Sequence, residues 1–451
     1  MNLTFRKIAV IGLGYIGLPT AAMFASRGID VVGVDIDSNT VNTINSGKVH
    51  IIEPDLDSMV YDTVNTGNLY AVTIPEPADA FLITVPSPFK DNHKPDVSFI
   101  ESAINSIAPV LSKGNLIIIE STSPVGTTEL ISQQLATLRN DLIFPHQDCN
   151  KTDIHIAYCP ERVMPGQIIH ELINNDRIIG GITPQCTDKA KSLYSLFVKG
   201  ECISTDSRTA EMAKLTENAF RDVNIAFANE LSIICDKLEI DVWELIKLAN
   251  RHPRVNILQP GPGVGGHCIA VDPWFIVHAA PHEANLIRTA REVNDNKPMY
   301  VLDKINKAAA FFEYPRIACL GLAYKPNTDD LRESPAVRIV QELGFISNVN
   351  ITIVEPNITT LPSFLAGYKQ FKLTHLEEAL ASSEIVVLLV AHNEFKDVNK
   401  NKFEGKIFIN IVNWETSQLH PASYQRDSHP SPGVSEYGLM MMNRIYGQIF
   451  P

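Results

Sequence analysis

Short apolar runs alternate with amphipathic stretches over the first part of the chain. Four continuous apolar runs are typical of parallel strands that are buried on both faces of a sheet. They lie at Lys7–Ile11, Val31–Asp35, Ala80–Val85 and Leu116–Glu120. Helical patterns alternate with these runs, for example over Phe99–Leu111. This rhythm predicts a doubly wound, Rossmann-type α/β domain over residues 1–205.

The middle of the chain changes to a helical period. One pattern with few helix breakers runs from Thr209 to about Ala249, and a second covers Asn285–Phe312. Because both stretches lack strand-like alternation, they predict an all-helical central segment over residues 206–312. Such a segment is a natural place for contact between subunits.

A second strand–helix pattern follows the helical segment. Its strand candidates are Ile317–Leu320, Ile351–Val354, Ile385–Val390 and Ile407–Val412. They predict a C-terminal α/β domain over residues 313–451. Within it, the stretch 415–451 scatters Pro, Ser and His without a period, so we expect little regular structure there.

Composition and charge exclude several classes of partner. The chain has 451 residues, of which 45% are hydrophobic and 20% charged, as in globular proteins of two or three domains. A net charge of −13 argues against nucleic acid or an anionic membrane as the main partner, and no run has the length of a membrane span. Seven scattered cysteines without a CxxC pair predict a reduced, cytoplasmic protein with no metal centre.

The run from Gly12 to Gly17, GLGYIG, carries the cofactor prediction. It follows a predicted strand and opens a predicted helix, where its glycines allow a tight turn and its backbone N–H groups can meet a pyrophosphate. Asp35 lies near the offset expected of a ribose-binding acid, and no arginine follows it to accept a 2′-phosphate. The run therefore favours NAD over NADP. FAD, or a turn that serves packing alone, are the alternatives.

The loop Gly261–Pro273 holds four glycines, two prolines and Cys268. A thiolate on such a loop can approach a substrate closely and attack a carbonyl carbon. A nucleotide oxidant together with this thiol suggests that an alcohol is oxidised to an aldehyde, trapped on sulfur and oxidised again to an acid. The alternatives are a small buried cysteine, or a zinc site with His267 and Asp272.

Polar residues at the ends of predicted elements are further candidates. The segment 120–128 is rich in hydroxyls and lies at the carboxyl edge of the predicted sheet, although such residues also serve as helix caps. Glu161 and Arg162 share a loop bounded by proline and glycine. Lys214, Asn218 and Arg221 lie on one helical face, which can bind an anion or transfer a proton. For Lys214, Asn218 and Arg221, the spacing alone favours an ordinary helix face exposed to solvent.

The C-terminal domain places charged residues where a dinucleotide fold has its phosphate loop. Lys325 follows a predicted strand, and Arg332 precedes a helix with Ser334 as its N-cap and Pro335 as its first residue. These two cations can hold the phosphates of a nucleotide or its sugar. The segment 251–254, RHPR, is a similar but more ambiguous basic stretch.

Six motifs together resemble the UDP-glucose/GDP-mannose dehydrogenase family, whose members make nucleotide uronic acids. Between residue 8 and about residue 340 the motifs are GLGYIGLP, ESTSPVGT, CPERVMPG, KLTENAFRDVNIAFANE, GPGVGGHCIAVDP and GLAYKPNTDDLRESPA. Within the family, HCIAVDP at 267–273 and NRHPRVN at 250–256 are similar to the acetamido-sugar branch. The UDP-glucose and GDP-mannose enzymes carry a GGSC-type loop instead.

The resemblance implies an NAD domain, a helical dimerisation segment, a UDP-binding domain and a homodimer. It implies Cys268 as the nucleophile, Lys214 as the proton donor or acceptor and Glu161 as a helper of hydrolysis. Asn218 and Asp272 would hold a water or an oxyanion. The implied NAD contacts are Gly12, Gly14, Tyr15, Ile16, Gly17, Asp35, Ser87, Thr122 and Thr128. The implied contacts to the UDP-sugar are Arg162, Val163, Lys214, Asn218, Arg221, His252, Arg254, Gly265, Tyr324, Lys325 and Arg332.

The implied reaction is a four-electron oxidation at C6 of a UDP-linked acetamido sugar, with UDP-N-acetylmannosamine as the first candidate, for surface polysaccharide such as lipopolysaccharide. There are two alternatives. One is the same chemistry on UDP-N-acetylglucosamine or UDP-glucose, and the other is a nucleotide-sugar binder without catalysis. One departure bears on affinity. Relatives carry an Asp-x-Lys-Gly element whose lysine helps to bind substrate, whereas this chain has Asn410-Ile411-Val412-Asn413-Trp414.

Overall fold

A computed structural model describes residues 5–90, 93–396 and 398–413. The chain divides into two compact units. Unit 1 comprises Met1–Glu217 and Trp274–Glu283, and unit 2 comprises Asn218–Pro273 and Ala284–Pro451. The expectation of little regular structure over 415–451 lies outside the described residues. Within the described ranges, no helix is long and apolar enough to cross a membrane.

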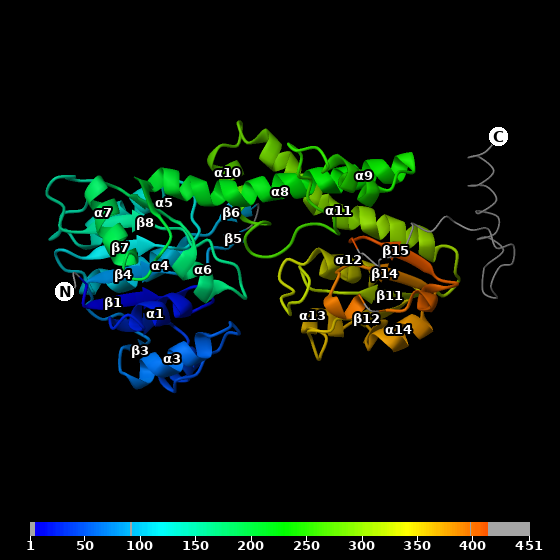
Figure 1. The fold of residues 1–451 in the computed structure, drawn as a ribbon, viewed down its shortest axis with the longest axis horizontal. Coiled ribbons are helices and arrows are strands. Elements are labelled where there is room, and N and C mark those ends of the chain that lie inside the picture. The colour runs from blue at the N-terminus through cyan, green and yellow to red at the C-terminus, as the bar shows by residue number, and fades with distance from the viewer. Residues whose placement is uncertain (1–4, 91–92, 397, 414–451) are drawn as a thin grey trace. The chain divides into compact units, whose positions relative to one another are not determined.

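Unit 1 is built on an eight-stranded sheet in the order β10-β9-β8-β7-β4-β1-β2-β3 (Figure 1). The strands are β1 Lys7–Ile11, β2 Asp30–Val34, β3 Leu69–Val72, β4 Ala80–Ile83, β7 Leu116–Ile119, β8 His155–Tyr158, β9 Arg177–Gly181 and β10 Cys202–Asp206. A separate hairpin pairs β5 (Phe89–Lys90) with β6 (Lys94–Pro95). Each of the four predicted apolar runs forms a strand of this sheet, so the doubly wound domain is confirmed.

Strands β8 and β9 depart from the parallel arrangement that the apolar runs predict. They pair antiparallel, with Ala157 opposite Gly181, whereas the other described neighbours in this sheet are parallel. The connection between them holds only the seven-residue helix α6 (Ile168–Asn174). A helix of that length spans about 10 Å, so the chain re-enters the sheet at the end where β8 leaves it.

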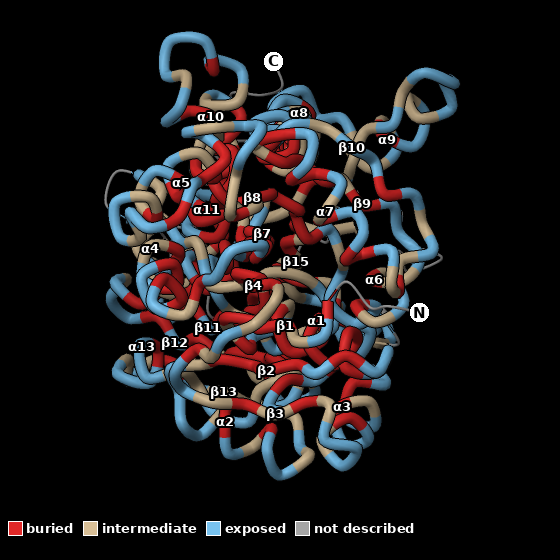
Figure 2. Tube along the Cα trace, turned by 90° about the vertical axis from the view of Figure 1, so that its left-hand side faces the viewer, coloured by how far each residue is buried: buried red, intermediate tan, exposed pale blue. Residues whose placement is uncertain are grey.

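Helices cover both faces of the sheet in unit 1, and its central strands are buried (Figure 2). Ile8 and Val10 of β1 belong to one apolar cluster, and the alternate residues Ala9 and Ile11 belong to another. This alternation explains why the strands are apolar at every position. The remaining helices of unit 1 are α1 Gly17–Ala25, α2 Ser38–Asn45, α3 Leu56–Asn65, α4 Ser98–Ile107 with the 3₁₀ turn η2 Ala108–Val110, α5 Thr127–Leu138 and α7 Pro184–Tyr194.

The central helical pattern forms α8 (Ser207–Leu238), α9 (Val242–Ala249), α10 (Asp272–Ala279) and α11 (Asn285–Ala309). The predicted helix from Thr209 to Ala249 is therefore two helices. The break has a local cause, because Glu239 takes a left-handed φ of 56° and Asp241 caps α9 by accepting from the Trp243 N–H at 2.8 Å. The boundary between the two units falls within α8.

Unit 2 contains a parallel five-stranded sheet in the order β13-β12-β11-β14-β15. Its strands are β11 Arg316–Leu320, β12 Asn350–Val354, β13 Phe371–Leu373, β14 Ile385–Leu388 and β15 Ile407–Asn410. Its helices are α12 Pro335–Leu343, α13 Ser363–Ala366 and α14 Leu376–Ser382, with 3₁₀ turns η3 Asn393–Phe395 and η4 Lys400–Phe403. As predicted, Ser334 caps α12, and its side chain accepts from the Val337 N–H at 3.4 Å. The predicted C-terminal α/β fold is confirmed.

The two sheets share one nucleotide-fold detail and differ in another. After β1 the Leu13 N–H donates to Asp35 Oδ2 at 2.9 Å, and after β11 the Leu322 N–H donates to Glu355 Oε2 at 2.7 Å. Asp35 is half-buried, whereas Glu355 is 4% exposed and is also bonded to His392 Nε2 at 3.0 Å. The acid of the second fold is therefore engaged by the protein itself.

Candidate active site

The loop from Gly12 to Gly17 joins β1 to α1 in unit 1. A Cβ placed on Gly17 would lie 1.8 Å from the Gly12 carbonyl oxygen, so the close turn requires glycine there. The Thr84 hydroxyl donates to that carbonyl over 2.7 Å, and its oxygen would lie 2.5 Å from the same Cβ. A Cβ on Gly14, in contrast, would meet nothing within 4 Å. The loop is thus fixed underneath and open above Gly14, which fits the close approach of a pyrophosphate.

Asp35 follows β2 and presents its carboxylate beside this loop. Oδ2 accepts from the Leu13 N–H at 2.9 Å and Oδ1 accepts from the Asp37 N–H at 3.0 Å. Ile36, the next residue, is 94% exposed. A fixed acid at this position can bind ribose hydroxyls and would repel a 2′-phosphate. The residues present therefore fit NAD.

The other predicted NAD contacts differ in their surroundings. Tyr15 is exposed, and Ile16 and Thr122 are half-buried. The buried Ser87 hydroxyl has no hydrogen-bond partner among the described residues, which leaves it available to a ligand. Thr128 is 0% exposed, and its N–H and hydroxyl both donate to Glu211 Oε1, at 2.8 and 2.6 Å. Its environment favours a structural role, and its contact with NAD stays a prediction.

Glu161 and Lys214 come together in unit 1. The Lys214 ammonium donates to the Glu161 carbonyl oxygen at 2.7 Å. The Glu161 side chain is 8% exposed, with Oε1 accepting from the Arg162 N–H at 2.7 Å and Oε2 paired with Arg177 at 2.9 Å. The Arg162 guanidinium is paired with Glu217 at 2.7 Å, and Val163 packs against the core. Glu161 is therefore buried and paired with Arg177, and it is not part of a solvated surface pair with Arg162.

Three buried residues near Glu161 were missed by the sequence analysis. Glu120 follows β7, Arg177 opens β9 and Tyr194 ends α7. Tyr194 Oη donates to Glu120 Oε1 at 2.5 Å, and the Arg177 guanidinium lies 4.7 Å from the Tyr194 ring. Glu120 could have been found from its place at the end of a continuous apolar run, because a charged residue there is buried with the strand that it follows.

Cys268 lies exposed in unit 2, at the start of a turn that leads into α10. Its carbonyl oxygen accepts from the Asp272 N–H at 2.9 Å. The Asp272 side chain is 2% exposed and accepts from Asn218 Nδ2 at 2.5 Å. The structure therefore brings three of the predicted catalytic residues together. For Cys268, the alternative of a small buried cysteine is wrong.

Two predicted segments of unit 2 pack against each other at the Gly265–Gly266 pair. A Cβ on Gly265 would lie 2.4 Å from the Glu333 carbonyl oxygen, and one on Gly266 would lie 2.8 Å from Tyr324 Cε2. Gly266 also has a φ of 82°, which side-chain-bearing residues rarely adopt. The Tyr324 ring therefore fixes the loop two residues before Cys268. Burial raises the pKa of the Tyr324 hydroxyl, so it stays protonated near neutral pH.

A buried polar chain anchors the beginning of the same loop. The Gly261 N–H donates to Asn229 Oδ1, Asn229 Nδ2 to Asn294 Oδ1, and Asn294 Nδ2 to Asp222 Oδ1, each at 2.8 Å. Asp222 is paired with Arg291 at 2.6 Å, and both side chains are at most 1% exposed. These residues were not predicted from the sequence, although Asp222 and Asn229 share the helical spacing of Asn218.

The basic residues predicted to hold the UDP-sugar belong to unit 2, apart from Arg162 and Lys214. Arg332 is fixed by Asp330 through bonds of 2.8 and 2.7 Å, and the Lys325 ammonium lies 5.6 Å from the Tyr324 ring. Arg221, His252 and Arg254 are exposed. Burial lowers the pKa of His267, and the Arg332 guanidinium lowers it further. Arginine and lysine side chains suit a diphosphate chemically, and the contact of each of these residues with a UDP-sugar stays a prediction.

The segment that replaces the Asp-x-Lys-Gly element is partly described. Asn410 ends β15, and its buried Oδ1 has no partner among the described residues. Asn413 Nδ2 approaches Gln259 Oε1 at 3.5 Å. Trp414 lies outside the described residues. The lysine of the element has no counterpart in this stretch.

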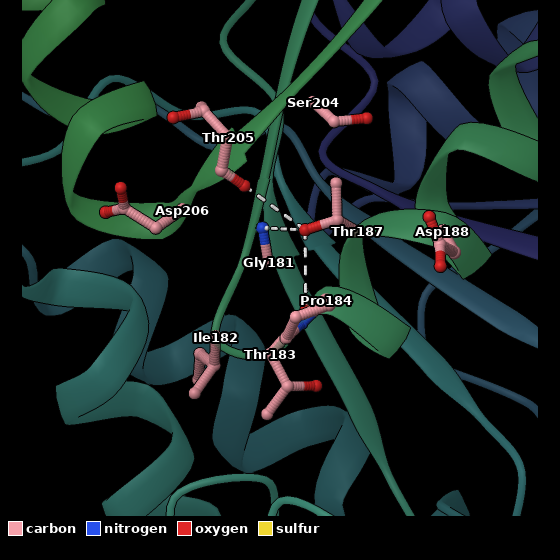
Figure 3. A pocket seen from close by; sticks show the side chains of 9 residues that line it. All are labelled: Gly181, Ile182, Thr183, Pro184, Thr187, Asp188, Ser204, Thr205 and Asp206. Atoms are coloured by element: carbon pink, nitrogen blue, oxygen red, sulfur yellow. Dashed lines mark hydrogen bonds between the residues drawn. The ribbon is translucent and has the colours of Figure 1, made fainter.

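A cavity of about 280 Å³ lies at the ends of β9 and β10, beside the start of α7 (Figure 3). Thr187 Oγ1 accepts from the Gly181 N–H there, at 2.9 Å. The lining residues are Gly181, Ile182, Thr183, Pro184, Thr187, Asp188, Ser204, Thr205 and Asp206. This lining carries two aspartates and no cation, so it is unsuited to a nucleotide phosphate, and it includes no predicted site residue.

Comparison with known proteins agrees with this geometry. The UDP-glucose/GDP-mannose dehydrogenase family matches as its NAD binding domain at residues 6–198, its central domain at 208–296 and its UDP binding domain at 318–414. A UDP-N-acetyl-D-mannosamine dehydrogenase of Campylobacter jejuni is 62% identical over 88% of this chain and 98% of the relative. An NDP-N-acetyl-D-galactosaminuronic acid dehydrogenase of Ralstonia nicotianae is 59% identical over 91% of this chain and 96% of the relative.

Among solved structures, the UDP-N-acetyl-mannosamine dehydrogenase of Staphylococcus aureus superposes with a TM-score of 0.80 at 40% identity, covering 92% of this chain and 96% of that one. The family matches follow the chain in the order of its two α/β folds and the helices between them. The glycine loop and Asp35 of the first fold fit NAD, in agreement with the match to the family's NAD binding domain. The chain thus belongs to the UDP-glucose/GDP-mannose dehydrogenase family.

Proposed function

We propose that this chain oxidises the C6 alcohol of UDP-N-acetyl-D-mannosamine to the carboxylate, with NAD⁺ as the electron acceptor. The observation that carries the proposal is the setting of Cys268, an exposed thiol on a loop fixed by Tyr324 and by the Asn218–Asp272 pair. A fixed, exposed thiol can capture an aldehyde carbon. The acetamido sugar is supported by the names of relatives that are 62% and 40% identical.

The first oxidation uses Lys214 as the acceptor of the C6 hydroxyl proton. NAD⁺, when bound by the Gly12–Gly17 loop and Asp35, would accept the hydride of each oxidation, so two molecules of it are consumed per sugar. Cys268 Sγ then bonds to the C6 aldehyde carbon, and the carbonyl oxygen takes a proton to give a thiohemiacetal. Loss of a second hydride and a proton converts this adduct to a thioester. Asn218 and Asp272 hold the oxygen at this carbon, or the attacking water.

Hydrolysis completes the proposed sequence. Water attacks the thioester carbon, the C–S bond breaks, and the sulfur of Cys268 leaves as the thiolate. Glu161 assists by accepting the proton that the water loses. Covalent capture also keeps the aldehyde from escaping before its second oxidation. The cations of unit 2, among them Lys325 and Arg332, would bind the UDP moiety.

We propose further that the protein acts as a homodimer. Phe220, Phe227 and Ile234 recur every seven residues along α8 and are 68, 54 and 44% exposed. Aromatic and aliphatic side chains at this spacing form an apolar stripe suited to a helix of a second copy. Sedimentation analysis tests this point, and a monomeric protein at micromolar concentration would contradict it.

We assign the reaction to the cytoplasm, on the state of the cysteines. Cys159, Cys186, Cys202, Cys235 and Cys319 are buried, and none of the seven cysteines is in a disulfide. A reaction that needs a thiolate nucleophile is suited to a reducing compartment.

A second candidate substrate is a nucleotide-linked N-acetylgalactosamine. The relative from Ralstonia nicotianae, named for the corresponding uronic acid, is 59% identical over 91% of this chain. The two sugars differ in the configuration of their ring substituents and share the C6 alcohol. The reacting groups above therefore serve either sugar, and only a direct comparison separates them.

The test is the amount of NADH released per sugar consumed by the purified protein. UDP-N-acetylmannosamine should give two equivalents and the uronate, with a higher kcat/KM than the N-acetylgalactosamine, N-acetylglucosamine and glucose analogues. Cys268→Ala should abolish net acid formation, whereas Cys149→Ala, at the other exposed cysteine, should retain it. Unchanged acid formation by Cys268→Ala would refute the thioester route, and binding without NADH would leave a non-catalytic binder.

A further inference from the structure

A buried cluster in unit 1 surrounds the side chain of Glu161. Arg177 is at its centre, with its Nη2 2.9 Å from Glu161 Oε2 and its Nη1 3.9 Å from Glu120 Oε1. The side chains of Glu120, Glu161 and Arg177 are 0, 8 and 5% exposed. One guanidinium therefore faces two carboxyl groups in surroundings that exclude most water.

Aromatic rings fix the Arg177 guanidinium in place. It lies 4.7 Å from the Tyr194 ring centre and 5.7 Å from that of Phe197. Arginine stacks well on such rings, so its planar group keeps one orientation. The Glu161 carboxylate has few other supports, because its second oxygen accepts only the N–H of the adjacent Arg162 in the described contacts. Arg177 is thus the long-range contact that orients Glu161.

The cluster contains one acid that changes charge near neutral pH. Burial raises the pKa of Glu120 to about 7, while Arg177 opposes the shift and Glu161 adds to it. The neighbouring Cys159 thiol lies 3.7 Å from Arg177 Nη1, and burial raises its pKa to about 12. Tyr194 has a pKa well above its usual value, again through burial. Both therefore stay neutral at pH 7.

We propose that Arg177 and Glu120 are positioning residues for the hydrolytic step, in which Arg177 orients the Glu161 carboxylate and the charge of Glu120 competes for the same guanidinium. The inference rests on the proposed role of Glu161 in thioester hydrolysis. When Glu120 is protonated and neutral, Arg177 forms its ion pair with Glu161 alone. Ionised Glu120 attracts Arg177 and weakens its hold on Glu161, so hydrolysis slows as pH rises through the titration of Glu120.

Pre-steady-state kinetics with UDP-N-acetylmannosamine and NAD⁺ separate this role from a merely structural one. Arg177→Met should keep the rapid burst of NADH, because the two oxidations precede hydrolysis. Its steady-state rate should fall on the order of 10- to 100-fold, as expected when a reacting group is misaligned. Intact-protein mass spectrometry should then show an acyl adduct on Cys268. Glu161→Gln should behave alike, and the double variant should be no slower than Glu161→Gln.

Controls keep the test decisive. Arg208→Met removes an exposed arginine that is paired with Glu129 at 2.7 Å, and it should leave the burst and the steady rate unchanged. Arg177→Lys retains the charge without the stacked fork, so it should accumulate the adduct to a smaller extent and carries the test if Arg177→Met does not fold. Glu120→Gln, which keeps the bond from Tyr194, should flatten the pH dependence of the steady rate between about pH 6 and 8.

Two outcomes would overturn the inference. If Arg177→Met and Arg177→Lys lose burst and steady rate equally, without an adduct, Arg177 has no specific part in hydrolysis. If Glu120→Gln keeps the wild-type pH profile, Glu120 does not compete for Arg177. A wild-type protein that releases no NADH from any UDP-sugar is a different result, because it refutes the proposed function itself.

Discussion

Asn218 donates a hydrogen bond to Asp272 over 2.5 Å, and this bond joins α8 to the first residue of α10. Asp272 in turn donates its own N–H to the Cys268 carbonyl oxygen at 2.9 Å. Both side chains of the pair are buried, at 7 and 2% exposed. A hydrogen bond to a buried carboxylate is stronger than one between neutral groups, so the turn that carries the thiol is held firmly to α8.

Replacing the acid of this pair should impair the chemistry without unfolding the chain. Asp272→Asn keeps the volume but removes the charge, so we expect a loss of about 1.5–3 kcal/mol in transition-state stabilisation, seen as a lower kcat/KM. Asp303→Asn, in the exposed pair with Lys307, is the matched control and should leave kcat/KM unchanged. Steady-state NADH formation measures both variants. An unaltered kcat/KM in Asp272→Asn would show that the charge at residue 272 is dispensable.

A methyl group at residue 266 should disturb the loop before Cys268. Gly266→Ala places a Cβ 2.8 Å from Tyr324 Cε2 at a φ of 82°, which should cost about 1–3 kcal/mol in stability and lower kcat. Gly367→Ala is the control, because its φ is −72° and its Cβ would meet nothing within 4 Å. Urea denaturation and NADH formation are the measurements. Equal stability of the two variants would contradict the packing of Tyr324 on this loop.

The acid at the end of β2 should decide between the two nicotinamide cofactors. Asp35→Asn retains an acceptor for the Leu13 N–H but removes the charge that repels a 2′-phosphate. We expect KM for NAD⁺ to rise about tenfold and the preference over NADP⁺ to shrink, with kcat little changed. Asp30→Asn, at the other end of the same strand, controls for the loss of one negative charge. If both variants keep the wild-type preference, Asp35 does not contact the ribose.

Stability should depend on pH through the buried Lys297, whose ammonium donates to the Asn229 carbonyl oxygen and to the Ser232 hydroxyl on α8. Burial lowers the pKa of Lys297 on α11 to about 8, whereas an unfolded chain binds this proton up to a pKa of 10.5. Between these values the unfolded state holds more protons, so stability should rise from pH 8 to 10 relative to a chain without the group.

Lys297→Met removes this titration, and the difference in melting temperature between wild type and variant should therefore move in favour of wild type as pH rises. Lys307→Met, on the exposed side of the same helix, should show no such trend. Thermal denaturation at pH 7, 8, 9 and 10 makes the comparison. If the difference in melting temperature between the two proteins is constant with pH, the pKa of Lys297 does not change on folding.

The parts of the fold that were predictable from sequence are those set by local pattern. The apolar runs located β1, β2, β4 and β7, because strands covered on both faces leave no polar position. Ser334 and Pro335 marked the start of α12 by helix-capping chemistry alone. The left-handed residue Glu239 was not predicted, because one non-glycine residue at positive φ leaves no periodic signal.

The candidate site was predictable where a motif is contiguous and was missed where the contacts are distant in sequence. Cys268 and Asp272 belong to one loop, and their neighbourhood followed from its glycines. Glu120 and Arg177 are 57 positions apart in the chain and meet only through the order of β7, β8 and β9. The antiparallel turn of β9 was not anticipated either, yet it is what brings Arg177 to the end of β8 where Glu161 lies.

Asp35 and Glu355 have equivalent positions in two related folds, but Asp35 is half-buried and accepts from two backbone N–H groups, whereas Glu355 is buried and also bonded to His392. With its acid already bonded to His392 and to its own loop, the second fold does not offer this carboxylate to an adenosine ribose. The NAD binding and UDP binding domains of the family match these two folds in turn, and the acid differs in its partners between them. The two nucleotide folds of one chain therefore differ in the partners of a single acidic side chain in each.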